Sequence, residues 1–299
     1  MLAPVKPMLA SPPKAERLAT LAGTHLFDLK LDGLRAIAYW DGLSLILLNR
    51  SMKDITAQFP ELEMTAPQLG GPCVLDGEIV AASGLFNDVA TRGKRTKPGD
   101  VARGVQEFPC VFVAFDALYA FDVDYRNHPF ETRRSILNST CDWGGCWQTS
   151  VISPDPAYFE QVKALGLEGI IAKRKRSTYR SGRFSDWIKF KTVRSITAIG
   201  VGYDPGEGAR AHFGAMHLAL LDANGQPVSV GRVGTGFDAR EIMALKEQMD
   251  AGVPVLCEIE CLNVTKDGQL RFPVYKGTRD PELSLADARL SQLDDIPRC

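Results

Sequence analysis

Two β-rich runs near the start of the chain meet at Asp41-Gly42. Residues 27–40 and 43–50 are rich in strand-forming side chains, and Asp-Gly fits the tight turn of a β-hairpin. Further strand-like runs cover residues 73–82, 109–120, 168–174 and 185–192, and helix-like runs cover residues 130–138 and 156–166. Residues 1–193 are therefore expected to form an α+β domain of antiparallel sheets with flanking helices.

Residues 194–299 show a different pattern, in which strands dominate. Asp238 and Glu241 stand at the spacing of a capping box, and the helix that they open is expected to end near Asp250. Strand-like runs surround this helix at residues 196–203, 213–222, 227–234, 253–264 and 269–277. Five short strands with one helix suit a small Greek-key barrel, so an all-β OB-fold domain is expected here.

Length and charge narrow the class of protein. A chain of 299 residues suits two domains, and 35 Lys and Arg against 36 Asp and Glu exclude a uniformly positive surface. No apolar run is long enough to span a bilayer, and an odd number of cysteines, seven, suits reduced thiols. We therefore expect a cytoplasmic protein with no membrane segment. Positive charge is clumped at residues 92–103 and 173–183, where it forms either a solvated face or a binding surface.

Familiar phosphate and metal motifs are missing from the sequence. It has no G-x-x-x-x-G-K-[ST] loop and no G-x-G-x-x-G between a strand and a helix. A P-loop ATPase and a Rossmann dehydrogenase are therefore poor fits. The pairs Cys141/Cys146 and Cys257/Cys261 have no second pair at zinc-site spacing, so we interpret these cysteines as structural.

One lysine stands between two carboxylates in an otherwise apolar run. If residues 27–40 form a single strand, Asp28, Lys30 and Asp32 share one face. Such a lysine is either an ion-paired surface residue or a nucleophile. A nucleophilic lysine needs a lowered pKa, because only the free amine attacks. Cations that could lower this pKa stand elsewhere in the chain: Arg35, Arg50, Lys189 and Lys191.

The run Lys30-Leu-Asp-Gly-Leu-Arg35 resembles the K-x-D-G-x-R signature of covalent nucleotidyltransferases, which comprise DNA ligases, RNA ligases and mRNA capping enzymes. The remaining motifs of the family are resembled, in order, by LLNR at 47–50, LDGEIV at 75–80, VFVAFDALY at 111–119, LEGIIAKR at 167–174, WIKFK at 187–191 and LRFPVYKGTR at 270–279. Ordered matches across nearly the whole chain are more specific than one motif. The sequences of these motifs are similar to those of ATP-dependent DNA ligases, above all bacterial enzymes of end joining and repair. The chain resembles the minimal two-domain form of these enzymes.

The resemblance implies roles for the matched residues. Lys30 would carry AMP as a phosphoramidate, with Asp32, Lys189 and Lys191 as further catalytic residues. The nucleotide would be bound by Asp28, Lys30, Arg35, Arg50, Glu78, Phe115, Ile171, Arg183, Lys189 and Lys191. Within that set, Asp28 would face the adenine amino group and Phe115 would stack on the base. Glu168 and Glu78 would hold Mg²⁺, or Mn²⁺ in its place. Contacts to DNA are implied for Arg35, Arg92, Lys94, Arg95, Arg174, Lys175 and Arg176.

The activity implied by the resemblance is ATP-dependent sealing of 5′-phosphate/3′-hydroxyl nicks in duplex DNA through lysyl-AMP, in DNA repair. Binding would not depend on DNA sequence, because phosphate contacts carry no sequence information. The enzyme would act as a monomer in the cytoplasm, at the nucleoid. An RNA ligase or RNA-end-processing nucleotidyltransferase is the alternative, and a non-catalytic nucleic-acid-binding module is a third.

One segment departs from the family's pattern. Motif VI usually continues as R-x-D-K, whereas Arg279 is followed here by Asp280-Pro281-Glu282. The departure implies slow self-adenylation, or substitution of the missing cation by Arg271 or Lys276. A loop within residues 84–107 is expected to become ordered on binding DNA. The sequence does not separate replication, repair and end-joining roles, and it names no recruiting partner.

Overall fold

The computed structural model describes residues 3–14, 17–206, 213–279, 284–294, 296 and 298. The chain forms two compact units, Met1–Lys191 and Thr192–Cys299, called unit 1 and unit 2 below. The division lies two residues before the boundary expected from the sequence. Among the described residues, every helix is too short or too polar to cross a membrane.

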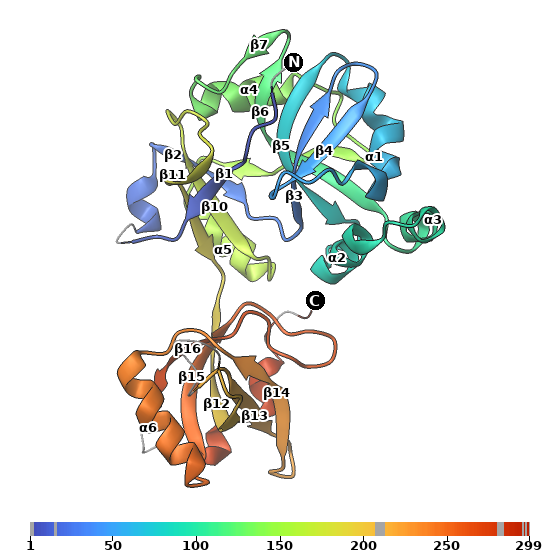
Figure 1. The fold of residues 1–299 in the computed structure, drawn as a ribbon. Helices are drawn as coiled ribbons and strands as arrows, with labels where there is room; N and C mark the ends of the chain where they lie inside the picture. Colours follow the sequence, from blue (N-terminus) through green and yellow to red (C-terminus); the bar gives the residue numbers. More distant parts are fainter. Residues whose placement is uncertain are drawn as a thin grey trace. The chain divides into compact units, whose positions relative to one another are not determined.

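Unit 1 is built on two sheets (Figure 1). The first has the strand order β4-β3-β5-β6-β7, and β8 pairs with β6 in parallel. Its strands are β3 (Leu34–Trp40), β4 (Leu45–Asn49), β5 (Cys73–Ala81), β6 (Cys110–Ala120), β7 (Val123–Asp124) and β8 (Trp147–Thr149). The expected hairpin forms between β3 and β4, where Asp41 Oδ1 accepts hydrogen bonds from the backbone N–H groups of Leu43 and Ser44.

The second sheet of unit 1 has the order β1-β11-β10-β2-β9. Its strands are β1 (Met8–Ser11), β2 (His25–Leu29), β9 (Ile152–Ser153), β10 (Gly169–Arg174) and β11 (Gly182–Lys191). The pairs among β11, β10, β2 and β9 are antiparallel, whereas the edge strand β1 runs parallel to β11. The expectation of antiparallel sheets therefore misses two parallel pairs, β1 with β11 and β6 with β8.

The single strand expected at residues 27–40 is wrong. The chain leaves the second sheet after Leu29, crosses over at residues 30–33, and enters the first sheet as β3. Gly33 allows this crossing, because a Cβ atom there would lie 2.3 Å from the carbonyl oxygen of Ile79 on β5. Lys30 and Asp32 consequently lie in this crossing and not in β2, the strand that carries Asp28.

Helices cover the outer faces of both sheets. They are α1 (Pro60–Thr65), α2 (Phe86–Lys94), α3 (Pro98–Glu107), α4 (Phe130–Asn138) and α5 (Tyr158–Ala164). Leu62, Val89 and Leu137 from α1, α2 and α4 pack into the core under the first sheet, and Val162 of α5 packs under the second. The loop expected at residues 84–107 is instead mostly helical, because α2 and α3 fill it.

A third apolar cluster lies between the two sheets of unit 1. Ile37, Phe115 and Leu118 come from the first sheet, and Met8 and Trp187 come from the second. Ile37 and Tyr39 of β3 join this cluster, while Ala36, Ala38 and Trp40 join the core on the other face, as the two-residue period of a strand requires. The sheets therefore pack face to face through buried side chains.

Unit 2 is a five-stranded antiparallel sheet with one long helix. The strand order is β14-β13-β12-β15-β16, and the strands are β12 (Arg194–Tyr203), β13 (Met216–Leu221), β14 (Pro227–Val233), β15 (Val255–Cys261) and β16 (Val274–Thr278). Helix α6 (Ala239–Asp250) begins and ends close to the positions expected. The backbone N–H of Asp238 donates to Glu241 Oε2, one half of the expected capping box. The altered segment Asp280-Pro281-Glu282 lies outside the described residues.

Candidate active site

A cavity lies between the two sheets of unit 1, and the strand register explains its floor. Ile171 on β10 is paired with Asp28 on β2 and with Lys189 on β11. Directly paired residues share a face, and so do residues two apart, which adds Lys173 and Trp187. All five side chains line the cavity. The first sheet contributes Arg35, Glu78 and Phe115, and β1, at the edge of the second sheet, contributes Leu9 and Ala10. The cavity is also lined by Lys30, Arg50 and Arg183.

Lys30 lies just beyond the end of β2 and is paired with Glu168. Its Nζ lies 2.5 Å from Glu168 Oε2, and the Nζ of Lys191 lies 3.4 Å from Glu168 Oε1. The Lys30 side chain is 22% exposed and that of Glu168 is 6% exposed. One carboxylate thus contacts two lysines, one of which lines the cavity.

The glycine after Glu168 explains how the carboxylate reaches this position. Gly169 has φ +141°, and a Cβ atom there would lie 2.1 Å from the carbonyl oxygen of Phe190 on β11. Only glycine fits so close an approach of two strands. The backbone N–H of Lys30 also donates to the carbonyl oxygen of Gly169, at 2.9 Å. The start of β10 and the nucleophile candidate are therefore tied together through the backbone.

Asp28 and Lys173 form a second lysine–carboxylate pair, and this pair is deeply buried. Lys173 Nζ lies 2.6 Å from Asp28 Oδ2, and the side chains are 2% and 1% exposed. The ammonium group also lies 4.1 Å from the centroid of the Phe115 ring and 4.3 Å from that of Trp187. Burial lowers the pKa of Lys173, and the charge of Asp28 opposes that shift. Asp28 Oδ1 has no hydrogen-bond partner among the described residues.

Arg35 makes more internal contacts than the sequence suggests. Its Nε and Nη2 atoms donate to the two carboxylate oxygens of Asp76 at 2.6 and 2.7 Å, and Nη2 also donates to the backbone carbonyl of Met8 at 3.0 Å. Its guanidinium lies 4.5 Å from the centroid of the Phe115 ring. Of its N–H donors, only those of Nη1 are left to bind a phosphate. Arg35 therefore has a mainly structural role beside the cavity.

Burial and neighbouring charges also shift the pKa values of Glu78 and Lys189, which line the cavity. Burial raises the pKa of Glu78 to about 7, against the opposing charges of Arg35 and Lys30. Burial, together with the neighbouring Lys191 and Arg183, lowers the pKa of Lys189. Cations therefore crowd one end of the cavity, which suits a ligand with several negative charges.

A metal ion would find few protein ligands here. No three His, Cys, Asp or Glu side chains gather into a metal site anywhere in the described part of the chain. Mg²⁺ is commonly held by one or two carboxylates together with substrate phosphates and water. Glu168 and Glu78 therefore fit a magnesium ion that arrives with a phosphate ligand. They do not fit a metal held by protein side chains alone.

The cations expected to contact DNA fall into two groups. Arg92 is fully buried, where its Nη2 donates to both carboxylate oxygens of Glu61 at 2.7 and 2.8 Å. Arg95 is paired with Glu107 at 2.6 Å. The expectation of a DNA contact is wrong for Arg92, because burial and the pair with Glu61 occupy its guanidinium, and Arg95 has little left to offer.

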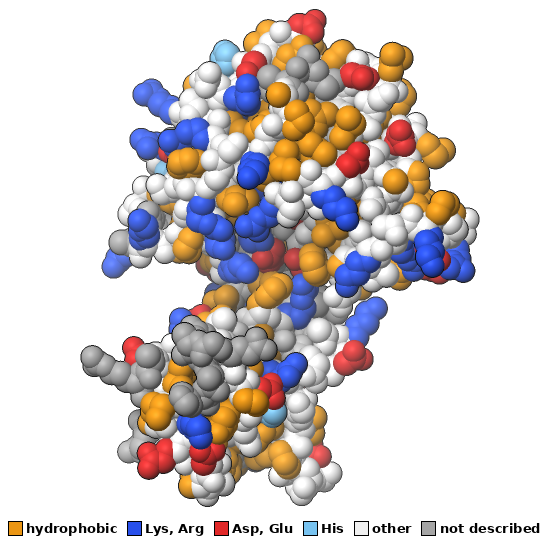
Figure 2. Space-filling view, viewed as in Figure 1, with side chains coloured by type: hydrophobic (Ala, Val, Ile, Leu, Met, Phe, Trp, Pro, Cys, Tyr) orange, Lys and Arg blue, Asp and Glu red, His pale blue; other side chains and the backbone are white. Residues whose placement is uncertain are grey.

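Apart from Arg35, whose guanidinium is bound to Asp76 and Met8, the other expected DNA-contact residues remain accessible. Lys94, Arg174 and Arg176 are exposed, and Lys175 is half-buried. Arg174 lies at the end of β10 opposite Glu168, and its Nη1 is 3.8 Å from Asp186. Figure 2 shows Lys and Arg side chains spread over one face of unit 1.

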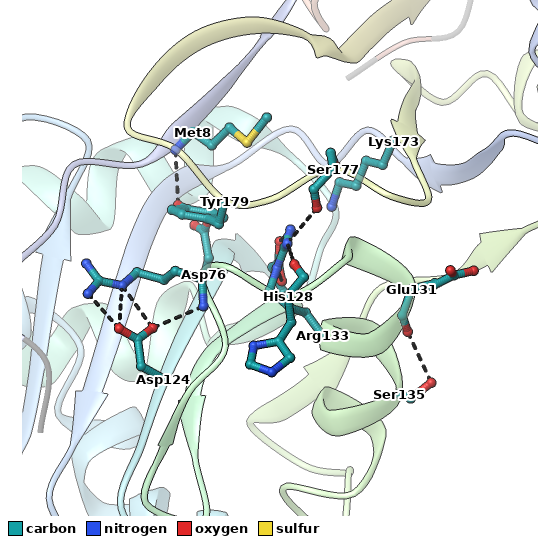
Figure 3. Close-up of polar contacts among 12 residues, drawn as sticks. Met8, Asp76, Asp124, His128, Glu131, Arg133, Ser135, Lys173, Ser177 and Tyr179 are labelled. Atoms are coloured by element: carbon teal, nitrogen blue, oxygen red, sulfur yellow. Dashed lines mark hydrogen bonds and ion pairs between the residues drawn. The ribbon is translucent and has the colours of Figure 1, made fainter.

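A buried polar network behind the cavity was not expected from the sequence. Arg133 of α4 donates to both oxygens of Asp116 at 2.8 Å and to the backbone carbonyl groups of His128 and Ser177, so it joins β6 to the loop between β10 and β11 (Figure 3). Lys173 and Trp187 were also missed. The period of two from Ile171 and Lys189 would have placed both of them on the cavity face.

Comparison with known proteins assigns the family. Residues 7–191 match the family model of the ATP dependent DNA ligase domain. The chain belongs to this family. It is 28% identical to a DNA ligase of Thermococcus onnurineus, over 97% of this chain and 58% of the relative, and 30% identical to DNA ligase C of Mycobacterium tuberculosis, over 78% and 67%. The crystal structure of the ligase domain of M. tuberculosis LigD superimposes with a TM-score of 0.55 at 27% identity, covering 95% of this chain and 97% of that domain.

The family confirms the mixed helix-and-sheet fold expected for unit 1 and the ligase resemblance read from the motifs. The chain spans about three-fifths of the length of the Thermococcus ligase and 36% of the multifunctional end-joining protein LigD of Mycolicibacterium smegmatis.

Proposed function

We propose that this chain is an ATP-dependent DNA ligase that seals 5′-phosphate/3′-hydroxyl nicks in duplex DNA through a lysyl-AMP intermediate, in DNA repair. The observation that carries the proposal is the pairing of Lys30 with Glu168 beside a cation-rich cavity. A protein that only bound nucleic acid would not need a lysine paired with a carboxylate beside such a cavity. Membership of the ligase family supports the same conclusion.

Lys30 would be the nucleophile of the first step. Its ammonium must lose a proton before it can attack, and Glu168 Oε2 is an acceptor within reach at 2.5 Å. Lys30 Nζ then forms a bond to the α-phosphorus of ATP, the bond from that phosphorus to the bridging oxygen breaks, and pyrophosphate leaves. Lys189, Lys191 and Arg183 would stabilise the negative charge on the phosphates, because their cations crowd this end of the cavity.

The base would lie at the other end of the cavity. The unpaired Asp28 Oδ1 is an acceptor suited to the adenine amino group, while Phe115 and Ile171 supply apolar surface for the ring. Arg50 lines the same cavity and is exposed, so it is suited to a ribose or phosphate contact. Asp32, in the crossing between the sheets, would help to place Lys30.

Mg²⁺ would be held by Glu168 and Glu78 together with the phosphates, and Mn²⁺ would substitute for it. The ion supplies neutralisation of phosphate charge when it is bound. Glu78 has a raised pKa without it, so this carboxyl is suited to a cation that lowers that pKa again.

In the two later steps AMP passes to the 5′-phosphate of the nick, and the 3′-hydroxyl then displaces AMP. Unit 1 would be the adenylation domain and unit 2 an OB-fold domain. The chain would act as a monomer, and both units would bind the nicked duplex without sequence preference. Lys94, Arg174, Lys175 and Arg176 are the accessible cations suited to the phosphate backbone.

Sealing of a labelled nicked duplex with ATP and Mg²⁺ tests the proposal. The intact chain should seal the nick, Lys30→Ala should not, and Lys53→Ala should seal normally, because Lys53 is an exposed lysine on the turn after β4. Failure of the intact chain on DNA, with sealing of an end that carries a 3′-ribose, would assign it to RNA. Failure on both, with no labelled enzyme–AMP, would refute the nucleotidyltransferase activity.

A further inference from the structure

Strand β1 is an edge strand, and half of its backbone hydrogen-bonding groups face away from its neighbour β11. Such unpaired groups normally face water or another chain. The carbonyl oxygen of Pro7 accepts from the backbone N–H of Gly182 on β11, so the next residue, Met8, turns its own N–H and C=O to the other side. Leu9 and Ala10, which follow, line the cavity. The position of β1 therefore sets one wall of the nucleotide site.

Two side chains hold the outward-facing groups of Met8. The backbone N–H of Met8 donates to the hydroxyl oxygen of Tyr179 at 3.0 Å, and its carbonyl oxygen accepts from Arg35 Nη2 at 3.0 Å. Figure 3 shows Tyr179 between Met8 and Asp76. A single residue of an edge strand is thus held at both its donor and its acceptor by side chains.

The two side chains are themselves joined through Asp76. The Tyr179 hydroxyl donates to Asp76 Oδ2 at 2.6 Å, and Arg35 donates to both oxygens of the same carboxylate. Asp76 and Tyr179 are buried, and burial together with the charge of Asp76 raises the pKa of Tyr179, so its hydroxyl keeps its proton. The contacts form a closed ring: Met8, Tyr179, Asp76, Arg35 and back to Met8.

We propose that Tyr179 is a positioning residue of the nucleotide site, because its hydroxyl, held by Asp76, fixes strand β1 as the cavity wall at Leu9 and Ala10. The inference rests on the proposed nucleotide site. Tyr179 does not line the cavity, and it acts on the nucleotide through β1. Removal of its hydroxyl therefore weakens nucleotide binding and leaves the chemistry at Lys30 unchanged.

The segment just before β1 supplies a matched control. The backbone N–H of Val5 donates to the hydroxyl of Tyr39 at 2.8 Å, which is the same kind of contact three residues earlier. Val5 does not line the cavity. Tyr39→Phe therefore removes a tyrosine hydroxyl that binds this segment, and it leaves the wall of the nucleotide site unchanged.

The test is the dissociation constant of α,β-methylene-ATP, an analogue that cannot transfer AMP, with Mg²⁺ and the full chain. Tyr179→Phe should raise this constant about tenfold, whereas Tyr39→Phe should change it less than twofold. With ATP, Tyr179→Phe should raise the KM of lysyl-AMP formation by a similar factor and leave kcat within about threefold. The amide of Met8 should exchange its hydrogen faster in Tyr179→Phe and at the normal rate in Tyr39→Phe.

Three results would overturn the inference. They are an unchanged dissociation constant in Tyr179→Phe with only a lowered melting temperature, equal weakening by both variants, and unchanged exchange at Met8. An intact chain that binds the analogue but forms no lysyl-AMP would instead refute the proposed function, and the effect of Tyr179 on binding would still be measured. An intact chain that does not bind the analogue would refute both.

Discussion

Two lysine–carboxylate pairs join the same two chain segments of unit 1, and they differ in burial. Lys30 follows β2 and is paired with Glu168, just before β10, whereas Asp28 on β2 is paired with Lys173 on β10. The Nζ–O distances are nearly equal, 2.5 and 2.6 Å, but Lys30 is 22% exposed and Lys173 is 2% exposed. The partly exposed pair can open to admit a substrate, while the buried pair cannot open without leaving a charge unpaired.

The two pairs differ in burial far more than in distance, and we infer that burial separates the proposed nucleophile Lys30 from the structural residue Lys173. A lysine that must lose its proton and bond to phosphorus needs access to the ligand. Lys173 instead contacts Asp28 and lies close to two aromatic rings, which fix its position. Four experiments test this difference, and they are described in order of decreasing expected effect.

Lys30→Arg should reduce labelled enzyme–AMP formation by more than about 10⁴-fold, because a guanidinium keeps its charge and cannot act as the free amine. The melting temperature should stay close to that of the intact chain, since a positive partner for Glu168 remains. Retained enzyme–AMP in this variant would show that another residue is the nucleophile. The Lys30–Glu168 pair would then not be the reactive one.

Lys173→Met should lower the free energy of unfolding by about 3–5 kcal/mol, because it leaves Asp28 buried without its partner. Lys30→Met should lower it by less than about 1 kcal/mol, since that pair is partly exposed. Urea denaturation of the two variants beside the intact chain measures both values. Equal losses would mean that burial does not distinguish the pairs.

Glu78→Gln should change how the stability of the fold depends on pH. Burial raises the pKa of Glu78 from its ordinary value of 4.5 to about 7 in the folded chain, so the fold favours the neutral carboxyl. The stability of the intact chain that depends on this group is fully present below pH 4.5 and is lost as pH rises through 7. Without Mg²⁺, Glu78→Gln should therefore be more stable than the intact chain at pH 8, by about 1–2 kcal/mol in the free energy of unfolding. Near pH 4.5 the two proteins should be equally stable. Thermal denaturation at both pH values, in the presence of a chelator, decides this.

Lys94→Ala should have the smallest effect. It should reduce the slope of log affinity for nicked DNA against log salt concentration by about 1 or less, without a change in melting temperature. Arg92→Ala, two residues away, should leave the slope unchanged and destabilise the fold, because Arg92 is buried against Glu61. A slope change in Arg92→Ala would contradict the assignment of this residue to the interior.

The sequence predicted most of the strands, and two of its errors share one cause. Helix α4 covers the predicted residues 130–138, and the ordered motifs indicated the residues that meet at the cavity. The predicted strand at 27–40 failed because Gly33 must approach β5, and the DNA contact predicted for Arg92 failed because Glu61 binds it. Both errors depend on partners far away in the sequence, which local patterns do not reveal.

The contacts of strand β1 determine how late during synthesis this strand can pair. Met8 is bonded to Tyr179, which is 171 residues further along the chain, and its neighbour strand β11 ends at Lys191. At about 5–20 residues per second, a ribosome would hold the N-terminal segment for about 10–35 s before its partner strand exists. Strand β1 is thus synthesised long before its partner strand, and the proposed nucleotide site is completed only when synthesis has passed through β11.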